Sequence, residues 1–77
     1  MNRLGYELLR DGKTDDAIEI FKLNVEAYPR SANTYDSLAE AYVKKGNKEE
    51  AIKYYSKALE VNPQFASAIE ALRQLKQ

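Results

Sequence analysis

An internal repeat of 34 residues constrains the fold of this chain more than any other feature. The positions that return after one period are Leu4-Gly5 as Leu38-Ala39, Gly12 as Gly46, Ala17-Ile18 as Ala51-Ile52, Phe21 as Tyr55, and Pro29 as Pro63. Self-similarity at a fixed period of this length indicates supersecondary units that bury their apolar faces by stacking on one another.

The spacing within each copy resembles the tetratricopeptide repeat, whose pattern is Trp-x2-Leu-Gly-x2-Tyr, then Ala-x3-Phe, then Pro. The second copy reads Tyr35-x2-Leu38-Ala39-x2-Tyr42, Ala51-x3-Tyr55, Pro63. The first copy reads Met1-x2-Leu4-Gly5-x2-Leu8, Ala17-x3-Phe21, Pro29. Because each unit of that family is a helix–turn–helix, the resemblance implies an all-α fold of antiparallel helix pairs. We expect two units plus a C-terminal capping helix, forming a fragment of a right-handed α-solenoid.

The boundaries follow from the turn residues. We expect one domain over residues 1–77, with the first repeat at 1–29, the second at 30–63 and the capping helix at 64–77. Glycine at 12 and 46 can take the left-handed conformation that ends a helix, and proline at 29 breaks one. The side chains expected to cap helix N-termini are Thr14, Ser31, Asn47 and Asn62. Pro63 would then occupy the first turn of the last helix.

Composition excludes several classes of function. Twelve basic and twelve acidic residues balance, so no net charge favours nucleic acid or an anionic membrane. The absence of cysteine and histidine excludes disulfides and the common zinc sites, and no metal or cofactor is expected. No apolar run approaches the roughly 18 residues that a membrane span needs. We expect a cytoplasmic location by default, unless the chain is excised from a larger exported protein.

A second resemblance bears on catalysis. Residues 21–42 resemble repeats appended to bacterial multidomain proteins, among them serine hydrolases similar to β-lactamases and other esterases. This resemblance implies an accessory C-terminal segment of a larger bacterial enzyme. No lysine stands three residues after any serine, and no histidine or cysteine supplies a nucleophile–base pair. We therefore expect no catalytic residue in the chain.

Binding is the function that remains. In stacks of such repeats the first helix of each pair lines the concave face, and its residues outside the core are the candidate contacts. They are Asn2, Tyr6, Leu9, Arg10, Asn33, Asp36, Glu40, Val43, Lys44, Glu70 and Gln74. Asp36 and Glu40 are four residues apart and point the same way from their helix, so a segment with lysine or arginine beside an apolar group would suit them. The alternative is that these are ordinary solvated charges, which Arg10 and Lys44 neutralise.

A second candidate surface lies on the first two helices. The helix expected to begin near residue 14 carries Ile20 and Leu23 in addition to its core residues. A helix that is apolar on two sides usually has two neighbours. We expect the surface around Met1, Leu4, Ile20 and Leu23 to be covered by an upstream domain or by a second copy of the chain. The alternative is that Ile20 and Leu23 are scattered surface residues.

Three functional hypotheses follow. The first is a non-catalytic module that presents a concave groove to a peptide or partner protein. The second is an element that self-associates or docks on its parent protein. The third is an accessory part of an enzyme that contributes no catalytic group.

Overall fold

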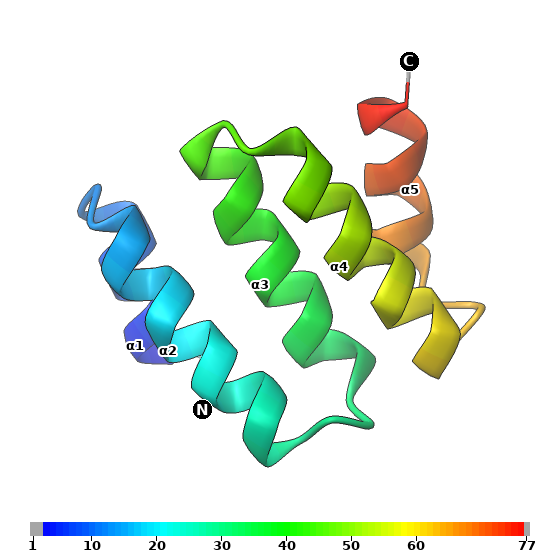
Figure 1. Ribbon diagram of the computed structural model, residues 1–77, viewed down its shortest axis with the longest axis horizontal. Helices are drawn as coiled ribbons and strands as arrows, with labels where there is room; N and C mark the ends of the chain where they lie inside the picture. The colour runs from blue at the N-terminus through cyan, green and yellow to red at the C-terminus, as the bar shows by residue number, and fades with distance from the viewer. Residues whose placement is uncertain (1–2, 77) are drawn as a thin grey trace.

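A computed structural model describes residues 3–76, and these form five α-helices with no strand among them (Figure 1). The helices are α1 (Arg3–Arg10), α2 (Thr14–Ala27), α3 (Ala32–Lys45), α4 (Lys48–Val61) and α5 (Ala66–Leu75). Each helix packs mainly on the next one along the chain, and Figure 1 shows α1 partly behind α2. The prediction of an all-α fold of helical repeats is confirmed.

The turns inside the two helix pairs form at glycines, as the sequence predicts. Gly12, between α1 and α2, has a φ of +80°, and Gly46, between α3 and α4, has a φ of +88°. This left-handed conformation costs glycine nothing because it has no Cβ, whereas other residues resist it. The Gly46 N–H bonds the carbonyl of Val43, and the Asn47 N–H bonds that of Tyr42, which closes the last turn of α3.

The N-terminus of α4 is capped as predicted, but the other expected caps differ. Asn47 Oδ1 accepts a hydrogen bond from the Glu50 N–H at 3.3 Å. The prediction for Thr14 is wrong, because this residue is already the first of α2 and Lys13 precedes it in the capping position. Ser31 does precede α3, but its side chain makes no capping bond within residues 3–76.

Thr34 supplies the polar contact at the start of α3 in place of Ser31. Its hydroxyl donates to the carbonyl of Ser31 at 2.7 Å and lies 3.2 Å from that of Tyr28. Thr34 is buried, so the contact fixes the turn that follows Pro29. Hydroxyl groups commonly bond a backbone carbonyl three or four residues earlier, and this bond competes with the capping role.

The last helix begins later than predicted. We expected Asn62 to cap it with Pro63 in its first turn, but α5 begins at Ala66 after Phe65. Asn62 Oδ1 instead accepts from the Gln64 N–H at 3.1 Å, which makes a turn of its own. Asparagine before proline favours such turns as strongly as it favours caps, and here the turn forms.

The core alternates small and large side chains along the repeat. Fully buried alanines lie where helices approach closely, at positions 17, 39, 41, 51, 58 and 68. Phe21 and Leu38 fill the wider gaps, and Tyr42 of α3 stacks on Tyr54 of α4 with ring centroids 5.7 Å apart. Close packing of this kind fixes the spacing of the helices and therefore the surface between them.

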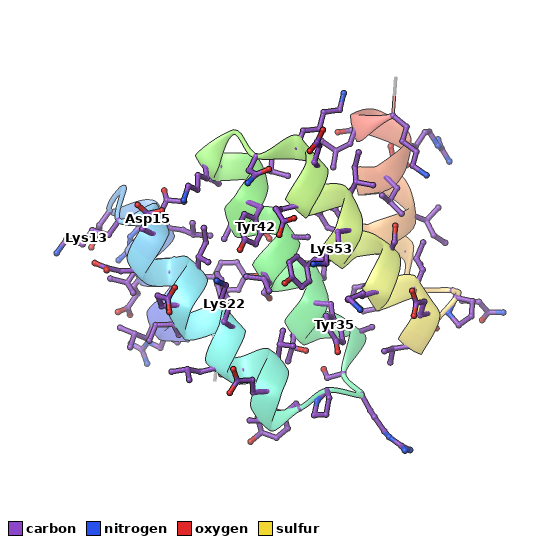
Figure 2. The ribbon with its side chains drawn as sticks, in the orientation of Figure 1. Lys13, Asp15, Lys22, Tyr35, Tyr42 and Lys53 are labelled. Atoms are coloured by element: carbon purple, nitrogen blue, oxygen red, sulfur yellow. The ribbon has the colours of Figure 1, made fainter. Side chains whose placement is uncertain are left out.

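Apart from Asp36, which is buried, the charged side chains described are wholly or partly exposed. Figure 2 shows Lys13 extending away from the turn between α1 and α2. Asp15, at the start of α2, forms an ion pair with Lys45, with 2.8 Å between Asp15 Oδ1 and Lys45 Nζ. This ion pair connects α2 to the end of α3. None of the described helices combines the length and the apolar character needed to cross a bilayer.

Candidate functional site

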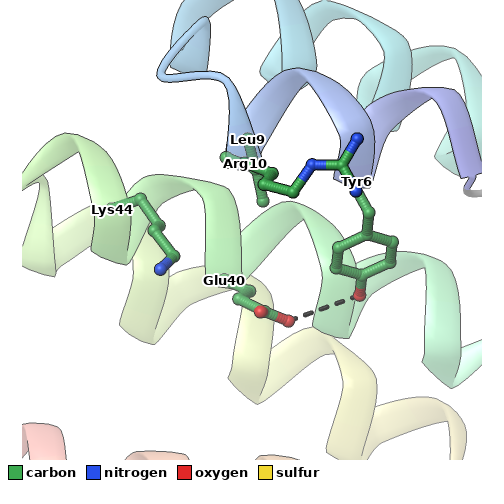
Figure 3. Close-up of a pocket in the computed structure, with 5 residues that line it drawn as sticks. All are labelled: Tyr6, Leu9, Arg10, Glu40 and Lys44. Atoms are coloured by element: carbon green, nitrogen blue, oxygen red, sulfur yellow. Dashed lines mark hydrogen bonds between the residues drawn. The ribbon is translucent and has the colours of Figure 1, made fainter.

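Two hollows flank α3 on the side where α1 and α5 lie. The first, of about 260 Å³, is lined by Tyr6, Leu9, Arg10, Glu40 and Lys44 (Figure 3). The second, of about 320 Å³, is lined by Val43, Tyr55, Ala71, Gln74 and Leu75. We refer to these two sites as the paired hollows. Each is near the lower end of the size range of small-ligand sites, so each suits one or two side chains of a partner.

Tyr6 connects α1 to α3 at the edge of the first hollow. Its hydroxyl shares a hydrogen bond of 2.8 Å with Ser37 and donates to Glu40 at 3.3 Å. The ring meets Phe21 edge-on, with centroids 5.1 Å apart, which holds the phenol in place. Burial raises the pKa of Tyr6, the bond to Ser37 lowers it, and the nearby Glu40 carboxylate raises it further. The hydroxyl therefore remains a proton donor to Glu40 at neutral pH.

Asp36 lies one turn before Glu40 and connects α3 to α5. The Ser67 hydroxyl lies 3.2 Å from each of its carboxylate oxygens. Only 7% of the surface of Asp36 is exposed. Burial raises the pKa of its carboxyl, the Ser67 bond lowers it, and the Glu40 charge raises it. We expected Asp36 on the accessible surface; the structure instead buries it, and its carboxylate accepts a hydrogen bond from the Ser67 hydroxyl.

Tyr55 of α4 forms the base of the second hollow. Burial raises its pKa to about 12, and the charges of Asp36 and Glu40 add to the effect. Tyr6, Asp36 and Tyr55 come from three different helices, and all three have a pKa that the Glu40 charge raises. The centre of the site is therefore electronegative.

The cationic side chains lie at one end of the first hollow. Arg10 and Lys44 are the last or next-to-last residues of α1 and α3, and both are exposed. Arg10 Nε is 3.9 Å from Asp11 Oδ1, a weak and solvated contact. Neither side chain forms an ion pair with Glu40 within the described part of the chain.

The predicted site residues divide into groups. Tyr6, Leu9, Arg10, Glu40 and Lys44 line the first hollow, although Leu9 is largely a core residue with 8% of its surface exposed. Val43 and Gln74 line the second. Glu70 pairs with Arg73 at 3.5 Å and Asn33 is exposed, and neither lines the paired hollows. Asn2 lies outside the described residues.

Tyr55, Ala71 and Leu75 line the second hollow, although the repeat pattern did not point to them. The 34-residue period could have pointed to the pairing of the hollows, because Leu9 recurs as Val43 and Glu40 recurs as Gln74. Within residues 3–76, no three acidic side chains come close enough together to hold a metal ion.

The surface proposed for docking is partly exposed. Leu4 and Leu23 are 53% and 60% exposed, and Ile20 is half-buried. The leucines one and two periods after Leu4 are Leu38 and Leu72, with only 1% and 9% of their surface exposed. Leu38 is covered because α3 packs against both α2 and α4, whereas α1 packs mainly on α2. Met1 lies outside the described residues.

Comparison with known families identifies the central helix pair. Residues 32–65, which span α3, α4 and the turn after them, match the family model "Tetratricopeptide repeat". This segment of the chain is therefore similar to a tetratricopeptide repeat. The match begins at the first residue of α3, so the hollows flank the first helix of the matched segment.

Known proteins similar to the chain are much longer. It is 29% identical over 75 residues to "Superkiller complex protein 3" of Homo sapiens and of Mus musculus, and to "Tetratricopeptide repeat protein 37" of Xenopus laevis. These alignments cover 97% of this chain but only 5% of each relative. None of the three names refers to a hydrolase, so these relatives give no support to the resemblance to repeats of β-lactamase-like enzymes.

Proposed function

We propose that this chain is a non-catalytic protein-interaction module that holds a peptide segment of a partner protein along a concave groove. The observation that carries the proposal is the pair of hollows on the two sides of α3, with Glu40 and Lys44 in one and Val43 in the other. A segment crossing α3 would contact both hollows, which are lined by residues of the four helices α1, α3, α4 and α5.

The comparisons support this class of function. Tetratricopeptide repeats generally mediate interactions between proteins, and the human and mouse relatives are by name parts of a complex. The electronegative centre of the site favours a basic segment of the partner, because Glu40 has no cationic partner within residues 3–76. The stability of the helices requires no such unpaired charge, and a ligand cation would complement it.

Peptide display tests the groove. A random peptide library is selected on the full chain, and the enriched peptides are measured again on Glu40→Lys. We expect at least tenfold weaker binding to this variant. The matched control is Glu60→Lys, an identical charge change at an exposed position near the end of α4, which should alter affinity less than twofold. If no peptide is enriched, or if the enriched peptides bind Glu40→Lys as well as the unchanged protein, the groove is not the binding site.

The exposure of Leu4 favours a second candidate, in which α1 and α2 self-associate or dock on a parent protein. Leucine is buried at both equivalent positions, Leu38 and Leu72, so Leu4 has the residue type but lacks the cover. Light scattering on the full chain tests self-association, and Leu4→Lys combined with Leu23→Lys should abolish any dimer while leaving peptide binding unchanged. An unchanged dimer in this variant would place the interface elsewhere.

A further inference from the structure

We infer that the paired hollows recognise an extended segment in which one basic residue and one apolar residue are separated by a single residue. The basic side chain lies against Glu40, and the apolar side chain enters the hollow between α3 and α5 beside Val43. This inference rests on the proposed function and specifies the chemistry of the partner.

The charge of the occupant follows from Glu40. Its carboxylate is half-buried, and its one described hydrogen-bond donor is the hydroxyl of Tyr6 at 3.3 Å. No ion pair within residues 3–76 involves Glu40 or Asp36. A carboxylate has room for several donors, so lysine or arginine of a partner can bind beside the Tyr6 hydroxyl.

The second hollow selects an apolar side chain. Val43 is 42% exposed at its rim, and Ala71 and Leu75 of α5 form the opposite side, with Tyr55 at the base. Gln74 is the only side chain of this lining with an amide group. An apolar group that enters this hollow removes its own surface and that of Val43 from water, which favours binding.

The separation of Glu40 and Val43 on α3 sets the spacing. Glu40 and Val43 are three residues apart on α3, so their Cβ atoms are roughly 5–6 Å apart. In an extended segment, alternate residues point to the same side at a separation of about 6.6 Å. Adjacent residues point to opposite sides and cannot reach both hollows together. The segment is therefore basic–x–apolar, in one chain direction or the other.

The cations at the end of the first hollow restrict the segment further. Arg10 and Lys44 lie beyond Glu40, towards the ends of α1 and α3, and repel a second positive charge placed there. A peptide with a single basic residue is therefore preferred over a polybasic one. This preference separates the inference from general attraction between opposite charges.

Defined peptides test the spacing on the full chain. The probes are acetylated and amidated heptapeptides of Gly and Ser that carry Arg-Gly-Leu, Leu-Gly-Arg, Arg-Leu or Arg-Gly-Arg at the centre, with fluorescence anisotropy as the readout. At least one of the two spaced peptides should bind fivefold or more tightly than both Arg-Leu and Arg-Gly-Arg. Equal affinities for the four peptides would overturn the inference.

Two variants locate each side chain. Glu40→Gln keeps the size of the side chain and should weaken the spaced peptide at least fivefold, but should change the affinity of its Arg→Ala analogue less than twofold. Val43→Ala should weaken the spaced peptide about threefold and leave its Leu→Ala analogue unchanged. Equal effects on a peptide and its analogue would overturn the assignment of that hollow.

The display selection separates the two levels of the proposal. Enriched peptides that bind at Glu40 but lack the basic–x–apolar pattern would overturn this inference and leave the proposed function standing. Failure to enrich any peptide sensitive to Glu40→Lys would overturn both.

Discussion

Gly5 lies in α1 at the point of closest approach to the ring of Phe21. A Cβ at this position would meet the Cε1, Cζ and Cδ1 atoms of the ring at distances that real side chains do not tolerate. Phe21 cannot withdraw easily, because it is fully buried and Tyr6 packs edge-on against it. The equivalent residue of the second repeat copy is Ala39. The second helix pair therefore accommodates a Cβ at this position, whereas the first pair packs too closely for one.

We predict that Gly5→Ala destabilises the protein by about 1–2 kcal/mol. Overpacking a core costs about 1–3 kcal/mol, and the better helix propensity of alanine returns up to about 1 kcal/mol of this. Urea unfolding measures the difference. Gly5→Ala should cost less free energy of unfolding in a Phe21→Leu background than in the unchanged protein. The double variant is compared with Phe21→Leu alone to measure this cost. A Gly5→Ala variant as stable as the unchanged protein would show that the two helices are further apart than described.

Ionisation of Tyr55 should lower the free energy of unfolding at alkaline pH. Its pKa is raised to about 12 by burial and by Asp36 and Glu40, whereas the unfolded chain ionises near 10. The folded state therefore retains a proton that the unfolded state releases, so stability is lost as pH rises from about 10 towards 12. At pH 11 this loss amounts to about 1.4 kcal/mol.

We predict that Tyr55→Phe loses less free energy of unfolding between pH 8 and pH 11 than the unchanged protein does. The difference between the two losses should be about this amount. Denaturant unfolding at the two pH values provides the measurement. Tyr28→Phe is the matched control, because Tyr28 is 47% exposed and its removal should leave the pH dependence unchanged. Identical pH dependence for the two variants would contradict the environment assigned to Tyr55.

The helix ends show how far the sequence alone predicts the elements. Glycine turns were placed correctly at Gly12 and Gly46, because a left-handed residue after a helix has few alternatives to glycine. Polar residues have several local uses, and the sequence does not decide among them. Thr14 begins a helix instead of capping it, and Asn62 forms a turn before α5.

The contact between α3 and α5 shows a limit of a different kind. The repeat placed residues of both helices on one concave face, but did not predict that the Ser67 hydroxyl would bond the carboxylate of Asp36, 31 residues earlier in the chain. Hydrogen bonds between helices depend on rotamers and on the offset of the helix axes, which a hydrophobic period does not encode. The spacing of four residues therefore assigned both Asp36 and Glu40 to the accessible surface. This assignment fits Glu40 but not Asp36.

Asp36 and Ser67 should make the docking of α5 depend on pH. Because the pKa of Asp36 is raised in the folded protein, its charge costs stability at neutral pH, and this cost disappears as the carboxyl is protonated. We predict that Asp36→Asn raises the unfolding midpoint at pH 7 and that the gain vanishes near pH 3, below the ordinary pKa. Thermal unfolding across this pH range measures it.

Ser67→Ala provides the opposite change in the same contact. It removes a donor to the carboxylate and should destabilise the protein by about 1 kcal/mol at pH 7. Amide exchange should then increase in α5 more than in α3. The opposite result would be that Asp36→Asn destabilises the protein at pH 7 as much as Ser67→Ala does. The hydrogen bonds of the Asp36 carboxylate would then stabilise the fold by more than the burial of its charge costs.

At the scale of the whole molecule, the sequence predicted the class of fold and the helices that carry the candidate site. It predicted them because a 34-residue period fixes which faces recur, and Glu40, Val43 and Lys44 all belong to the expected face of α3. It did not predict the separation of that face into two hollows. That division depends on where α5 places Ala71 and Leu75 beside Val43, which is a property of the assembled stack.

We propose that the exposed Leu4 and Leu23 make folding and self-association dependent on each other. Two helix pairs and one further helix give a small core, and repeat proteins usually need about three units for stability. Cover over Leu4 and Leu23 would bury apolar surface that the single chain leaves in water. The folded state is then stabilised by any association that supplies this cover.

We predict that the midpoint of thermal unfolding rises with protein concentration, by roughly 3–6 °C for a tenfold increase, because each tenfold step stabilises a dimer by about 1.4 kcal/mol. Leu4→Lys with Leu23→Lys should remove this dependence. The matched control, Val61→Lys with Ile69→Lys, makes the same change at two exposed apolar positions of α4 and α5 and should retain it. A midpoint independent of concentration in the unchanged protein would mean that the monomer is stable with Leu4 in water, and the paired hollows would then be the one surface supported for binding.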